Sequence, residues 1–190
     1  LDFKNFISKN KIKQIYISKS LEHLKERILR LFNLQEYKNN FDRTIFFGIY
    51  LEEDFSFIEN HNGLKFIMLG GSDVPNITRI KCNNIISISK DIKDRLNVIG
   101  LESILINFNL VDKNIFKPME NLGNRIYVYD GRIDKDDNKK IYNTKLISEI
   151  KKKLPNYSFI HSSKMSERPN RDMVNTYCQC FIGLRLTNHD

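Results

Sequence analysis

Short apolar segments alternate with amphipathic segments along nearly the whole chain, and this alternation restricts the fold more than any other feature. Apolar runs stand at 14–18, 44–50, 64–69, 84–89 and 103–108. The segments between them place apolar residues at helical spacing, as at Leu21, Leu24 and Ile28. Strands buried on both faces of a parallel sheet have such near-continuous apolar sequences, and helices connect them. The sequence therefore predicts an α/β fold with parallel sheets.

The pattern is interrupted once and then begins again. The stretch from Val111 to Gly123 contains Pro118 and has no clear period, which is typical of a linker. Apolar runs return at 125–129, 157–161 and 181–186, with helical spacing at 139–154 and 171–180. We therefore expect a first lobe at 1–112, a linker at 113–123 and a second lobe from 124 to 190.

Composition narrows the class of protein and of partner. Hydrophobic residues make up 41% and charged residues 28% of the chain, which are ordinary values for a globular protein. The formal net charge of +8 favours an anionic partner such as nucleic acid, a phosphorylated small molecule or a membrane surface. Three irregularly spaced cysteines predict free thiols in a reducing, cytoplasmic compartment. No apolar run reaches the roughly 18 residues that a spanning helix needs.

The first unusual loop is Gly70-Gly71-Ser72-Asp73, directly after the apolar run at 64–69. Ligands of open parallel sheets bind beyond the carboxyl ends of the strands, and glycines allow a ligand or another backbone to approach closely. Two interpretations remain open. Ser72 or Asp73 caps the next helix in a tight turn, or Asp73 contacts an acceptor hydroxyl as a catalytic group.

The second unusual loop follows the apolar run at 125–129. It contains Gly131, Arg132 and Lys135, and Lys139 comes shortly after. Arginine can hold phosphate oxygens in a bidentate way, and the N-terminus of a helix favours an anion, so the loop can bind a diphosphate. The other interpretation is a solvated polar loop, in which the aspartates balance the positive charge. His161, at the end of a strand, is a weaker candidate for a ligand contact.

The order of these features resembles the GT-B glycosyltransferases, especially the group-1/family-4 type. The resemblance covers 44–190 and is carried by "IMLGGSDV", "IISISKDIKDRL", "NLVDKNIFKP" and "YVYDGR" in succession. It implies two Rossmann-like lobes, with Gly70, Gly71 and Ser72 on the acceptor side. The family's glutamate-bearing segment of the donor lobe is not found before residue 190, so the resemblance implies a partial chain with an incomplete second lobe.

The resemblance also implies an activity. Family members move a sugar from a nucleoside-diphosphate sugar to an acceptor hydroxyl on a glycan or glycolipid, without a cofactor and generally without an essential metal. Asp73 would orient the acceptor, and Gly131, Arg132, Lys135 and Lys139 would bind the donor diphosphate. The expected location is cytoplasmic, with peripheral contact to a membrane also consistent with the positive charge.

Two alternatives remain. A sugar-nucleotide epimerase can use the same scaffold, but it needs further acid and base residues that the sequence does not single out. A non-catalytic module that binds nucleic acid would use clustered basic and aromatic side chains on one face. Phe and Tyr lie mostly within the apolar runs here, so we expect them in the core and expect no nucleic-acid partner.

Overall fold

The computed structural model describes residues 1–111, 117, 123–130, 142–162 and 170–186, with the backbone alone for 170–172. The chain divides into two compact units, Leu1–Val111 and Asp112–Asp190. The predicted linker at 113–123 lies almost entirely outside the described residues.

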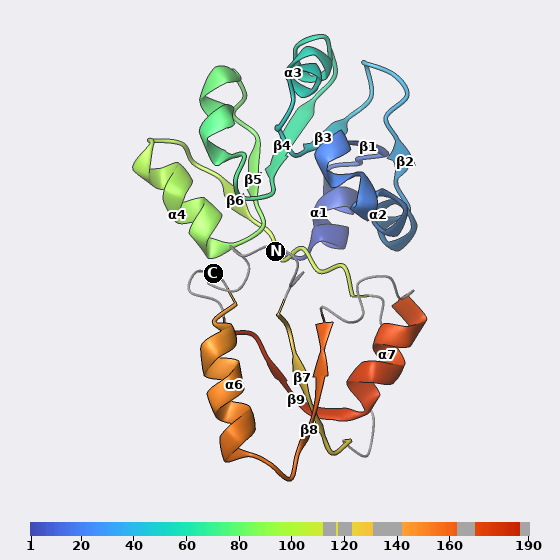
Figure 1. Cartoon of the computed structure of the whole chain (residues 1–190). Coiled ribbons are helices and arrows are strands. Elements are labelled where there is room, and N and C mark those ends of the chain that lie inside the picture. Colours follow the sequence, from blue (N-terminus) through green and yellow to red (C-terminus); the bar gives the residue numbers. More distant parts are fainter. Residues whose placement is uncertain (112–116, 118–122, 131–141, 163–169, 187–190) are drawn as a thin grey trace. The chain divides into compact units, whose positions relative to one another are not determined.

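Unit 1 is built on a six-stranded sheet (Figure 1). Its strands are β1 (Gln14–Ile17), β2 (Gln35–Glu36), β3 (Thr44–Phe47), β4 (Lys65–Leu69), β5 (Ile85–Ser87) and β6 (Ile104–Leu105). They lie in the order β2-β1-β3-β4-β5-β6, and every neighbouring pair is parallel. Because β2 and β3 flank β1 on opposite sides, the direction of winding reverses between β1 and β3. Such a topological switch point is where open α/β sheets bind ligands.

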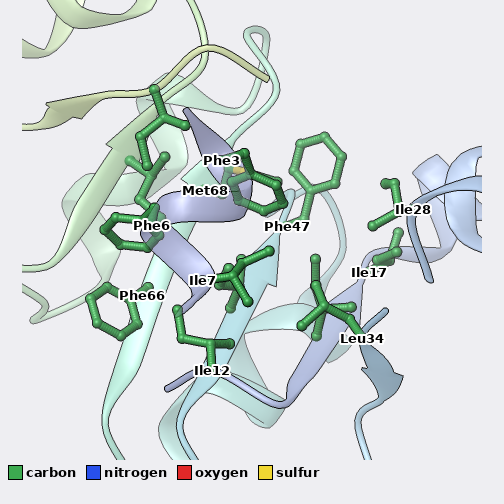
Figure 2. Packing of buried hydrophobic residues seen from close by; sticks show 14 residues of the cluster. Phe3, Phe6, Ile7, Ile12, Ile17, Ile28, Leu34, Phe47, Phe66 and Met68 are labelled. Carbon is green, nitrogen blue, oxygen red and sulfur yellow. The ribbon is translucent and has the colours of Figure 1, made fainter. Parts of the chain in front are cut away.

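Alternate residues of a strand point to opposite faces of the sheet, and helices cover the apolar side chains on both faces. The helices α1 (Phe3–Lys9) and α2 (Lys25–Phe32) pack on one face, where Ile45 and Phe47 of β3 are buried. Figure 2 shows Phe3 and Phe6 of α1 within this cluster. Phe46 points to the other face, which is covered by α3 (Glu52–Glu59), the 3-10 helix η2 (Val74–Arg79) and α4 (Lys90–Val98).

Unit 2 repeats this layered arrangement at a smaller size. Among the described residues, β7 (Arg125–Val128), β8 (Ser158–His161) and β9 (Cys180–Leu184) form a parallel sheet in the order β8-β7-β9. Ile126 and Val128 pack with Ile147 of α6 (Thr144–Lys153) on one face. Tyr127 packs toward Met173 of α7 (Asn170–Cys178) on the other face.

The predicted α/β fold with parallel sheets is confirmed. Ser18 caps a 3-10 helix, η1 (Lys19–Leu24), and α2 follows it. Ser89 caps α4 by accepting a hydrogen bond from the Ile92 N–H. The elements α1 and β2 were not predicted. No helix within the described residues is long and apolar enough to cross a membrane.

Candidate functional site

The candidate site of unit 1 lies at the carboxyl edge of its sheet, where the apolar strands give way to polar and glycine residues. Gly48 and Tyr50 follow β3, and the loop from Gly70 to Asp73 follows β4. Gly48 has φ +85°, a left-handed conformation that glycine adopts without strain. These loops belong to the switch point of the sheet, so their geometry decides what a ligand meets there.

Asp54 holds the switch point together from the first turn of α3. It is fully buried, and its Oδ1 accepts a hydrogen bond of 2.8 Å from the Tyr16 hydroxyl. Its Oδ2 accepts from the Ser18 hydroxyl and from the N–H groups of Tyr50 and Leu51, each at 2.8 Å. The carboxylate thus ties the end of β1 to the loop after β3. Burial, followed by the hydrogen bond to Asp54, raises the pKa of Tyr16 well above its ordinary value.

Asp73 holds the neighbouring loop in a similar way. The residue is fully buried, and its Oδ1 accepts from the N–H groups of Gly70 at 2.9 Å and Gly71 at 2.8 Å. Its Oδ2 accepts from the Ile49 N–H at 3.1 Å. Burial raises the pKa of the Asp73 carboxyl, an effect that the backbone N–H donors partly offset. Although Asp73 stands at the start of η2, its side chain makes no cap hydrogen bond to that helix.

Gly70 and Gly71 are glycines for different structural reasons. A Cβ on Gly70 would lie 2.5 Å from the Tyr50 hydroxyl, so a larger residue here would require the Tyr50 side chain to shift. Gly71 has φ +132°, which side chains rarely adopt, and its Cβ would meet open space. Arg95 of α4 donates a 3.0 Å hydrogen bond to the Gly71 carbonyl. The loop is therefore fixed from both sides while Ser72 remains exposed.

The second candidate site lies at the carboxyl edge of unit 2. Asp130, two residues after the end of β7, is 3% exposed, and its Oδ2 lies 2.6 Å from Nδ1 of His161 at the end of β8. Its Oδ1 accepts a 3.0 Å hydrogen bond from the Ser162 hydroxyl, whose oxygen in turn accepts from the Asp130 N–H. An ionised carboxylate only accepts, so Nδ1 carries the proton and Nε2 is the free atom of the ring. Nε2 is buried and has no hydrogen-bond partner among the described residues.

This Asp130–His161 pair has a chemical consequence. Because Asp130 holds Nδ1, Nε2 is the ring nitrogen that is left for a further hydrogen bond. Arg185, just after β9, lies 5.5 Å from the centre of the Tyr129 ring and brings a guanidinium to the same edge of the sheet.

Of the two predicted groups of site residues, only the group in unit 1 lies within the described residues. Asp73, Gly70, Gly71 and Ser72 form one loop at the carboxyl edge of unit 1, as expected for residues that follow a parallel strand. The predicted diphosphate contacts lie outside the described residues; they are Gly131, Arg132, Lys135 and Lys139.

Sequence reasoning missed Asp54, Ser18 and Asp130. Each stands within one turn of the end of an apolar strand run, at the edge where ligands bind. Their position at the ends of strands was the one sequence signal that could have marked them as candidate site residues. It could not identify the partners, because Asp54 and Tyr16 are separated by 38 residues and Asp130 and His161 by 31.

Comparison with known proteins gives no relative for this chain. No family model, curated protein or solved structure matches it.

Proposed function

We propose that the chain is a glycosyltransferase of the two-lobed GT-B kind, acting in glycan or polysaccharide synthesis. It would move a sugar from a nucleoside-diphosphate sugar to an acceptor hydroxyl. The observation that supports this most is the architecture. Two separate parallel α/β units each place a central strand between two later ones, β1 in unit 1 and β7 in unit 2. Each unit therefore offers its own switch-point edge, one for each substrate.

In this proposal unit 1 serves the acceptor. Asp73 is a positioning residue, since its buried carboxylate is bound to three backbone N–H groups. The exposed Ser72 is the side chain that reaches the acceptor, and Gly70 and Gly71 would let the acceptor approach this loop closely. Asp54 keeps the adjoining loop at Tyr50 in place. Fixed polar groups reduce the entropy lost when a substrate is oriented for reaction.

Unit 2 would bind the donor. The departing diphosphate gains negative charge in the transition state, and Arg132, Lys135, Lys139 and the N–H of Gly131 would stabilise that charge. His161, oriented by Asp130 at 2.6 Å, lies at the edge from which this loop departs and is an additional candidate for a donor contact. The transfer would use the nucleoside-diphosphate sugar as donor substrate, without a cofactor or an essential metal. Peripheral association with an anionic cytoplasmic membrane surface is consistent with the net charge of +8.

The test is nucleotide binding followed by donor turnover. Isothermal titration with UDP, GDP and their sugars should give saturable binding to the wild-type chain. Arg132→Ala should lower the rate of sugar release or transfer by about 100-fold, because one lost contact to developing charge has that effect. The control is Lys152→Ala, at the exposed end of α6, which should behave as wild type.

Three outcomes would contradict the proposal. Absence of any response to nucleoside diphosphates would exclude a glycosyltransferase, and salt-dependent binding of RNA or DNA alone would favour the nucleic-acid module. Interconversion of a bound sugar nucleotide without transfer would favour the epimerase.

A further inference from the structure

A cavity of about 490 Å³ opens at the β2 edge of the sheet in unit 1. It is lined by residues from β1, by Leu29 of α2 and by Phe57 of α3, and these two helices cover opposite faces of the sheet. The origin of the cavity is the shortness of β2, which pairs only with Gln14 and Ile15. The lateral edge of β1 beyond Ile15 is therefore not covered by this strand. The volume is in the range of small-molecule sites.

Three aromatic rings form part of the wall. Tyr16 and Phe57 have ring centres 4.7 Å apart, and Tyr37 lies 5.8 Å from Phe57. The Tyr16 hydroxyl is bound to Asp54, so that tyrosine contributes its ring to the cavity while its polar end is already satisfied. Phe57 is 40% exposed although it belongs to this aromatic cluster. A partly exposed aromatic side chain that lines a cavity suits a ligand with a flat C–H surface.

Charged side chains of both signs surround the aromatic wall. Lys25 pairs with Glu22 at 3.0 Å and with Glu36 at 2.6 Å, and Lys19 pairs with Glu53 at 2.8 Å. The lining thus contains three glutamates and two lysines, which leaves one net negative charge. Each lysine is already compensated by a carboxylate. A phosphorylated ligand would meet acidic excess here, in a chain whose total charge is +8.

We propose that this edge cavity binds a neutral carbohydrate. A sugar ring has an apolar C–H face that stacks on aromatic rings, and its hydroxyls both donate and accept hydrogen bonds. Phe57 and Tyr37 supply the stacking surface. Glu36 and Glu53 accept from the hydroxyls, and Lys25 donates to them. That this sugar belongs to the acceptor of a transfer reaction rests on the proposed function, whereas the binding itself does not.

The experiment is saturation-transfer NMR on the full chain with neutral disaccharides, namely maltose, lactose, cellobiose and mannobiose, followed by titration of the best probe. At least one should bind, with its ring C–H protons receiving most of the saturation. Phe57→Ala should weaken binding about tenfold, because a stacking surface is lost. Glu53→Gln should weaken it less and should leave the C–H pattern unchanged. The matched control is Phe41→Ala, which removes a 74% exposed ring of the same unit that does not line the cavity.

Three results would overturn this inference. The first is that none of the disaccharides binds. The second is that Phe57→Ala binds the sugar as tightly as the wild type and Phe41→Ala do. The third is that inorganic phosphate competes with the sugar. Thermal unfolding of each variant identifies any loss of fold, and Glu53→Gln keeps the test decisive if Phe57→Ala is unstable. Nucleotide-sugar titration of the same samples separates the two proposals. If disaccharides bind and nucleotides do not, only the proposed glycosyl transfer is contradicted. If nucleotide sugars bind and disaccharides do not, only sugar binding in the edge cavity is contradicted.

Discussion

At the scale of single residues, two buried carboxylates fix the loops at the carboxyl edge of the sheet in unit 1. Asp54 and Asp73 are both fully buried, and each accepts hydrogen bonds from backbone N–H groups of loops at the carboxyl edge of the sheet. A buried charge is tolerated only when hydrogen bonds replace the lost water. Here the replacement comes from loop backbone, so the same contacts that stabilise the charge also fix the loops.

Replacing Asp54 should reveal this dependence. Asp54→Ala leaves two hydroxyls and two N–H groups without their acceptor, and we expect the free energy of unfolding to fall by about 3 kcal/mol. Urea denaturation followed by circular dichroism measures the change. Asp91→Ala, which removes an exposed carboxylate 3.8 Å from Arg95, should cost less than about 1 kcal/mol. Equal losses in the two variants would mean that Asp54 does not have the role described.

At the scale of elements, two helices of unit 1, η1 and α4, begin where a serine at the end of a strand supplies an acceptor. Ser89 provides its hydroxyl to the Ile92 N–H and begins α4. Ser18 does the same for η1 and also donates to Asp54. The buried apolar residues of α4, Ile92 and Leu96, then dock on the face of the sheet that Phe46 shares. Local capping therefore sets where a helix starts, and packing sets where it lies.

Removing the cap of α4 gives a prediction at this scale. Ser89→Ala should lower the free energy of unfolding by about 1 kcal/mol, because the first turn loses an acceptor for one of its N–H groups. Ser89→Asp should restore most of it, since aspartate caps equally well and its charge suits the N-terminus of a helix. The measurement is the midpoint of urea denaturation, compared between the wild type, Ser89→Ala and Ser89→Asp. A destabilised Asp variant would indicate that the hydroxyl has another role.

At the scale of the whole molecule, the chain consists of two units with separate cores. The two apolar clusters of unit 1 draw all their residues from 1–111. The clusters of unit 2 lie between 126 and 186. Both units share the arrangement of a parallel sheet covered by helices on its two faces.

This separation predicts independent folding of unit 1. A chain of residues 1–111 contains both apolar clusters and all six strands, so it should unfold cooperatively in urea. Far-ultraviolet circular dichroism and the near-ultraviolet tyrosine signal should change together. A shorter chain of residues 1–89 lacks α4 and β6 and should show no such transition. If residues 1–111 were themselves without a cooperative transition, the core of unit 1 would depend on the rest of the chain.

The sequence by itself determined the kind of elements and their succession. Runs such as 44–50 and 64–69 are apolar on both faces, and a strand between two helical layers requires such runs. The short α1 and the two-residue β2 were not predictable, because Phe3–Lys9 and Gln35–Glu36 are too short to establish a period. The predicted strand at 103–108 is reduced to Ile104–Leu105 at the edge of the sheet, where only one neighbour provides hydrogen bonds.

Only the tertiary structure decided the order of the strands and the partners of the polar groups. Periodicity is a property of neighbouring residues, whereas the pairing of Asp130 with His161 depends on two strands lying side by side. The location of Asp73 was predictable from the end of β4. Its bond to the Ile49 N–H was not, because that contact follows from the docking of β3 beside β4. The edge cavity likewise exists because β2 ends early, which no local pattern in the sequence indicated.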